Sequence, residues 1–167
     1  LQVLADETDT GAAQTVEVNG FTLERADEAS QWTVVAFDGS TTEAIIPDAV
    51  KSDGTVIDNP EKVVPESVMY IEESVFDEMT NVESLKLPKY LKKILKDGDG
   101  SSTSQTLSKL TSLNSFESNN EGNMFYAYDG ALYAGKKIIS YPQQKTGDYE
   151  IKDGTTAADE LAFMNAN

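Results

Sequence analysis

Residues 64–94 read VPESVMYIEESVFDEMTNVESLKLPKYLKKI, and this stretch contains one phrase twice. The pattern V-P-x-x-V-x-x-I of residues 64–71 returns as L-P-x-x-L-x-x-I in residues 87–94, with each position shifted by 23. A fixed period of roughly 20–50 residues is typical of solenoids, whose repeats bury their apolar faces by stacking on one another. The stretch therefore predicts a stacked repeat and favours a binding surface over an enzyme.

Val82, Leu85 and Leu87 have the L-x-x-L-x-L spacing of a leucine-rich repeat. Because side chains alternate along a strand, Leu85 and Leu87 share one face, and we expect that face to be buried. We therefore expect a mainly β fold, a right-handed leucine-rich repeat solenoid. Each repeat of about 23 residues would hold a strand and a short helix or turn.

Two hairpin signals stand outside the repeats. Asn19-Gly20 and Asp129-Gly130 each lie between alternating apolar residues, the strongest short-range signal for a two-residue hairpin. The first predicts an antiparallel β cap over the open end of the solenoid, and the second predicts a β-meander inserted into it. The expected organisation is a disordered tail (1–15), the β cap (16–46) and a repeat domain (47–167) with insertions at 97–106 and 123–142.

Composition excludes several classes of chemistry. The chain has 167 residues, 29 acidic against 13 basic, a net charge of −16 and neither cysteine nor histidine. Such a chain repels nucleic acid, and it cannot build a disulfide, a thiolate nucleophile, a Ser-His-Asp triad or a Cys/His zinc site. Asp97-x-Asp99-x-Ser101 begins like a calcium loop but lacks the later glycine and glutamate, so we expect only an acidic loop. We predict no enzyme activity, no cofactor, no metal site and no transmembrane segment.

Several phrases resemble the BspA-type leucine-rich repeat family. They are Ile71 with Val75-Phe76, the D-G-A-L-Y block of residues 129–133, Tyr141-Pro142 and Ala162-Phe163. The resemblance implies a secreted or cell-surface bacterial protein, often adhesin-like, with no shared catalytic residues. Val3-Leu4-Ala5, which has the small-x-Ala pattern of a signal-peptidase site, agrees with export.

The function expected from these features is an extracellular, adhesin-like binding module for a host or microbial protein or glycan. The alternative is a structural spacer that holds another module away from the cell surface. A binding module should carry an aromatic or charged patch on one face, whereas a spacer should be uniformly polar.

Candidate ligand contacts come from the repeat register. The central residue of each L-x-L phrase points away from the core, which predicts an exposed column of Val63, Lys86, Asn114 and Glu150. Tyr126 and Tyr128 add aromatic contact area, although packing under the meander is the favoured reading of these rings.

Five lysines between residues 86 and 96 could form a basic patch for an acidic partner. The favoured reading is instead a charge ladder, with Lys89 stacked on Glu66 and Lys96 on Glu73.

Overall fold

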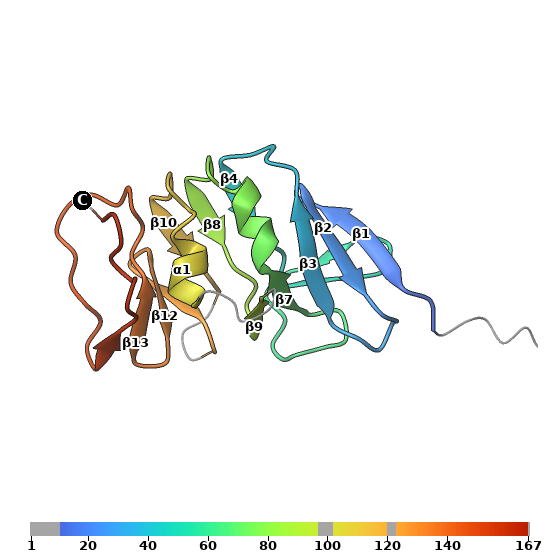
Figure 1. Cartoon of the computed structure of the whole chain (residues 1–167). Helices are drawn as coiled ribbons and strands as arrows, with labels where there is room; N and C mark the ends of the chain where they lie inside the picture. Colours follow the sequence, from blue (N-terminus) through green and yellow to red (C-terminus); the bar gives the residue numbers. More distant parts are fainter. Residues whose placement is uncertain (1–10, 97–101, 120–122, 167) are drawn as a thin grey trace, which may run out of the picture.

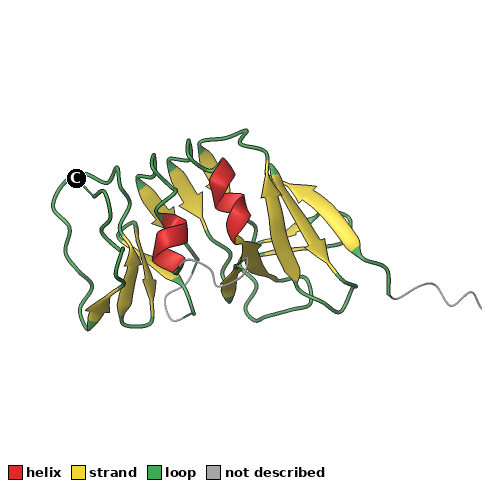
Figure 2. Ribbon diagram, in the orientation of Figure 1, coloured by secondary structure: helices red, strands yellow, loops and turns green. Residues whose placement is uncertain are grey.

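The structure is a computed structural model that describes residues 11–96, 102–119 and 123–166. Its described part is mainly β and elongated, with small sheets lying side by side between β1 at one end and the C-terminal segment at the other (Figure 1). The two short helices of the described residues, η1 (Glu73–Glu78) and α1 (Thr103–Leu107), lie on the same side of the molecule (Figure 2).

The first sheet has the order β1-β2-β3-β7-β9. Its strands are β1 (Gln14–Val18), β2 (Phe21–Arg25), β3 (Trp32–Phe37), β7 (Val68–Glu72) and β9 (Lys93–Leu95). The first three strands are antiparallel, and β7 and β9 then add in parallel to β3. Asn19 and Gly20 both have positive φ, 54° and 83°, so the predicted primed hairpin turn is confirmed.

The second sheet is wholly parallel, in the order β10-β8-β4. It is formed by β4 (Glu43–Ile45), β8 (Ser84–Lys86) and β10 (Ser115–Glu117). Leu85 lies between Ala44 and Phe116, and all three side chains are buried. Leu87 is also buried, so the burial expected from the L-x-L spacing is confirmed.

The remaining strands form two further sheets. β5 (Ala49–Val50) pairs with β6 (Val56–Ile57), and the fourth sheet has the order β11-β12-β13-β14. Its strands are β11 (Tyr126–Tyr128), β12 (Ala131–Ala134), β13 (Lys137–Ser140) and β14 (Ala157–Ala158). The first three are an antiparallel meander, as predicted, with positive φ at Asp129 and Gly130.

The prediction of a right-handed leucine-rich repeat solenoid is wrong, because the strands of the described residues divide among four small, separate sheets. The 23-residue register holds for one neighbouring pair, β7 and β9, where Ile71 lies opposite Ile94. The register does not extend to β8, because the residues of β4 and β10 that pair with β8 are not 23 positions away in the sequence. The physical reason is that β8 ends just before Leu87 and Pro88, and a proline has no backbone N–H to donate to the hydrogen-bond ladder between strands. The chain therefore leaves one sheet there and enters another at β9.

The predicted column of Val63, Lys86, Asn114 and Glu150 is also wrong. Lys86 lies opposite Ile45 and Glu117 in the second sheet, whereas Val63 and Glu150 lie outside all strands and Asn114 just precedes β10. The prediction of this column assumed one uniform register along a single sheet, and the separate sheets do not have such a register.

Two helices close the core between the sheets. The 3-10 helix η1 (Glu73–Glu78) buries Val75 and Phe76, and the α-helix α1 (Thr103–Leu107) buries Leu107. The side chain of Ser102 caps α1 by accepting a hydrogen bond from the backbone N–H of Gln105, at 3.2 Å. These apolar side chains belong to one continuous cluster that reaches from β1 to β13.

A buried carboxylate joins the loops between the sheets. Asp48, which is 2% exposed, accepts hydrogen bonds from the backbone N–H of Asn59 at 2.9 Å and of Lys89 at 2.8 Å. It also accepts one from the side-chain amide of Asn119 at 2.5 Å. The Asp48 carbonyl accepts a further bond from the N–H of Val68, where β7 begins. One residue thus fixes four segments that are distant in sequence.

We expect Asp48→Ala to lower the free energy of unfolding by about 3 kcal/mol or more, because it leaves three donors without their acceptor in a buried site. Urea denaturation of the variant and the wild type measures the loss. Asp53→Ala is the matched control, because Asp53 is exposed and accepts only a local bond from the N–H of Thr55. Equal midpoints for Asp48→Ala and the wild type would contradict this role.

Candidate functional site

Strand alternation gives the first sheet two different faces. The inner face contributes Phe21, Leu23, Trp32, Val34 and Ile71 to the core, and all five are fully buried. The outer face is covered neither by another sheet nor by a helix in the described part of the chain. Residues of this outer face are therefore available to a ligand.

An open groove of about 600 Å³ runs across this outer face. That volume is within the usual range of ligand pockets, roughly 300–1,000 Å³. The strands contribute Gln14, Thr15, Glu24, Arg25, Thr33, Val35, Tyr70, Glu72 and Leu95 to its lining. Ala13, Ala26, Ser30 and Gln31 complete its rim from the adjoining turns.

The register places several lining residues in one row across the sheet. Thr15 lies opposite Glu24, and Glu24 opposite Thr33. Thr33 in turn lies opposite Tyr70. Successive members of such a row are about 4.8 Å apart at the backbone, so the row provides evenly spaced polar groups beside a tyrosine ring.

Val35 lies on the outer face with Thr33, as alternation from Trp32 and Val34 requires, and a β-bulge follows at this point of β3. On β2, Thr22 pairs with Ala36 and Leu23 with Val34, so Val35 is the extra residue of β3. Bulges redirect side chains, and here the bulge changes the alternation. Unbroken alternation from Trp32 and Val34 would bury Ala36, but Ala36 is exposed and Phe37 is buried instead.

The polar groups of the groove fall into two kinds. Arg25 is already engaged: its guanidinium stacks 4.4 Å from the Trp32 ring centroid, and its Nε donates to Oε1 of Gln14 at 2.7 Å. By contrast, within the described part of the chain, the side chains of Glu24, Glu72 and Tyr70 make no hydrogen bond or ion pair. These three side chains remain available to a ligand.

The predicted tyrosines lie at the other end of the molecule and pack against one another. Tyr126 is buried and stacks on Tyr133, with ring centroids 5.6 Å apart, and Tyr128 meets Tyr133 edge-on at 6.1 Å. The Tyr126 hydroxyl donates to the carbonyl of Gly135. Tyr133 and Tyr149 share a hydrogen bond of 2.7 Å between their hydroxyls. The packing reading of the tyrosines is confirmed.

The other predicted contacts are not brought together. Lys86 lies 3.9 Å from Asp58, and the N–H of Asn114 donates to the carbonyl of Glu83 at 2.7 Å. Glu150 is exposed and lies in the segment between β13 and β14, outside all strands. The predicted ladder partner of Lys89 is also wrong: its Nζ donates to Asn59 and to the carbonyl of Pro60. The binding roles of Lys86, Asn114 and Glu150 stay predictions.

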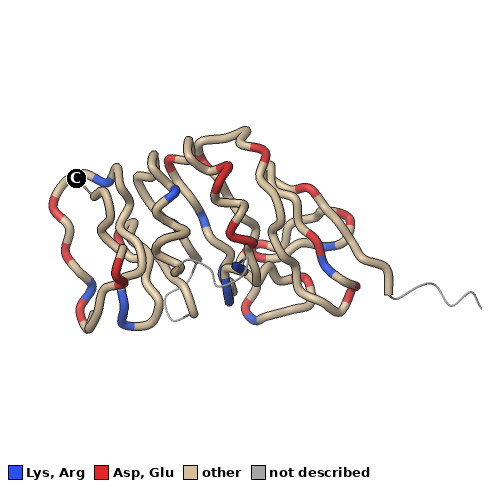
Figure 3. Tube along the Cα trace, viewed as in Figure 1, with Lys and Arg blue, Asp and Glu red and all other residues tan. Residues whose placement is uncertain are grey.

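Sequence reasoning missed the groove. The one available signal was Val35, an apolar residue placed opposite the core-facing Trp32 and Val34. Acidic residues are spread along the whole molecule (Figure 3), so the carboxylates of Glu24 and Glu72 had no distinguishing pattern in the sequence.

No metal centre or membrane helix is visible in the part of the chain that the structure describes. Among residues 11–96, 102–119 and 123–166, no three acidic side chains gather closely enough to hold a metal ion. In the same ranges, no helix has the length and apolar character needed to cross a bilayer. The incomplete calcium loop, Asp97-x-Asp99-x-Ser101, lies outside the described residues.

Comparison with known proteins adds no assignment: no family model, no curated protein and no solved structure matches the chain.

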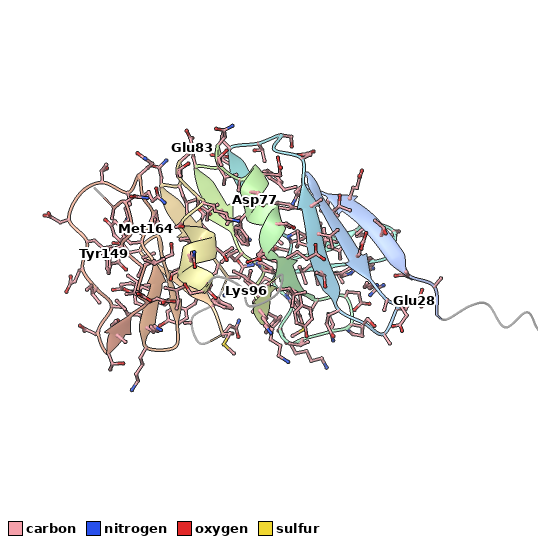
Figure 4. The ribbon with its side chains drawn as sticks, in the orientation of Figure 1. Glu28, Asp77, Glu83, Lys96, Tyr149 and Met164 are labelled. Atoms are coloured by element: carbon pink, nitrogen blue, oxygen red, sulfur yellow. The ribbon has the colours of Figure 1, made fainter. Side chains whose placement is uncertain are left out.

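Tyr149, at the C-terminal end (Figure 4), gives the tyrosine cluster a pH dependence. Burial, and then the hydrogen bond with Tyr133, raise the pKa of Tyr149 far above its usual value of 10.0. Because the folded state holds this proton more tightly, the stabilisation is complete below pH 10 and is lost as the pH rises further. We expect the free energy of unfolding to fall more steeply above that pH in the wild type than in Tyr149→Phe. Urea denaturation at pH values on both sides of pH 10 measures how steeply the free energy of unfolding falls in each protein. Identical slopes in the wild type and Tyr149→Phe would contradict the role of Tyr149 in this pH dependence.

Proposed function

We propose that the chain is a non-catalytic binding module of an extracellular protein and that its ligand lies in the groove on the outer face of the first sheet. The groove itself carries the proposal. Val35, Tyr70 and Leu95 form an apolar floor on a sheet face that no described sheet or helix covers, and the polar side chains of Glu24, Glu72 and Tyr70 beside it make no hydrogen bond or ion pair with described residues. Concave, mostly apolar sites with a few convergent polar groups are the usual form of a binding site.

An extracellular location agrees with the Val3-Leu4-Ala5 triplet, which has the small-x-Ala pattern of a signal-peptidase site. The phrases that resemble BspA-type proteins point the same way. An adhesin-like role would use the groove as the contact surface.

A spacer is the second candidate, and the elongated arrangement of the sheets favours it (Figure 1). A spacer needs length but no ligand, so the two candidates differ in whether the groove is used. Peptide, matrix-protein and glycan arrays probed with the labelled chain distinguish them.

We expect Val35→Arg to weaken binding of the array ligand about tenfold or more, because the long charged side chain fills the apolar floor. Ile45→Arg is the matched control: Ile45 is an aliphatic strand residue that is 47% exposed in the second sheet, outside the groove. Thermal unfolding of both variants checks that they fold. Equal loss in both variants would refute the groove as the site, and no ligand on any array would favour the spacer.

A further inference from the structure

The charges of the groove indicate the chemistry of its ligand. Among the residues that the structure describes, the charged groups of the groove without a hydrogen bond or ion pair are two carboxylates, Glu24 on β2 and Glu72 on β7. Arg25 is occupied by Trp32 and Gln14, and Lys93 lies beyond Tyr70 on the edge strand β9, outside the lining. With a net charge of −16, the chain also attracts cations over long range.

The strand register of the first sheet fixes the distance between the two carboxylates. Glu24 shares a row with Tyr70, two strand spacings away, and Glu72 lies two residues beyond Tyr70 on β7. With strands about 4.8 Å apart and a rise of about 3.3 Å per residue, their backbones are separated by about 12 Å. The line between them crosses β3 near Thr33 and Val35.

An extended peptide matches this spacing. Residues i and i+4 of an extended chain lie about 13 Å apart and point to the same side, with residue i+2 midway between them. Basic side chains at i and i+4 would then reach Glu24 and Glu72. An apolar side chain at i+2 would lie on Val35, beside Tyr70 and Leu95.

We propose, building on the binding function above, that the groove takes an extended segment of a partner protein with the pattern basic-x-apolar-x-basic. A neutral glycan fits less well. Two of the three floor residues are aliphatic, which gives a sugar ring only one aromatic platform, and neutral hydroxyl groups would leave both carboxylates without a counter-charge.

The test uses the whole 167-residue chain and a blocked peptide, acetyl-Lys-Ser-Leu-Ser-Lys-amide, titrated against isotope-labelled protein by NMR. We expect shifts of the backbone amides of Glu24, Thr33, Val35 and Glu72, and weaker binding at higher salt. The peptide with glutamate in place of both lysines should bind more weakly than the basic one.

Substitutions then identify the two ion pairs. Glu24→Gln and Glu72→Gln should each weaken binding about two- to five-fold, the range of exposed ion pairs. Because the two sites are far apart, their effects should combine to about four- to twenty-five-fold in the double variant. Glu17→Gln is the control, because Glu17 is an exposed glutamate of β1 in the same sheet, outside the groove lining, and it should leave the affinity unchanged.

Three results would overturn the inference. The first is equal binding of the acidic and basic peptides, and the second is equal loss in Glu17→Gln and the groove variants. The third is a neutral oligosaccharide that shifts the NMR signals of the same amides while the basic peptide shifts none. That result would keep the groove as the binding site but would rule out a peptide as its ligand. Failure of the groove itself is recognised separately, by an array ligand that Val35→Arg does not weaken.

Discussion

The carboxylate of Asp48 is the interaction on which the arrangement of the sheets depends. It is buried, and its two oxygens accept bonds from Asn59, Lys89 and Asn119. These partners lie in the segments that lead into β7, into β9 and out of β10. Apolar burial is non-directional and can hold separate sheets together in many ways. Hydrogen bonds to a buried carboxylate have defined directions, so they select one relative placement of these segments.

The groove depends on that placement. Its floor combines Val35 from β3, Tyr70 from β7 and Leu95 from β9, which the chain brings together only after long excursions. The Asp48 carbonyl holds the N–H of Val68 at the start of β7, and its carboxylate holds Lys89 just before β9. The same residue that joins the sheets therefore positions two of the three strands that form the floor.

The local features of the fold were readable in the sequence because they depend on neighbouring residues. Asn19-Gly20 requires positive φ at both positions, and the L-x-L spacing fixes a buried face. The separate sheets were not readable, since the choice of partner for β8 depends on where the chain turns at Pro88. The role of Asp48 was equally hidden, because its partners lie 11, 41 and 71 residues away. The groove was missed because its lining comes from strands far apart in the sequence, and Val35 alone does not indicate that Tyr70 and Leu95 lie beside it.

Native-state hydrogen exchange of individual amides tests the central role of Asp48 most directly. The N–H groups of Asn59 and Lys89 lie in loops, yet each donates to the buried carboxylate. The N–H of Thr55 also donates to an aspartate, Asp53, but that carboxylate is exposed and offers a reference. If Asp48 holds the sheets together, the Asn59 and Lys89 amides exchange far more slowly than Thr55, at the rate of the strand amides of β7. Exchange of all three loop amides at one fast rate would contradict the account.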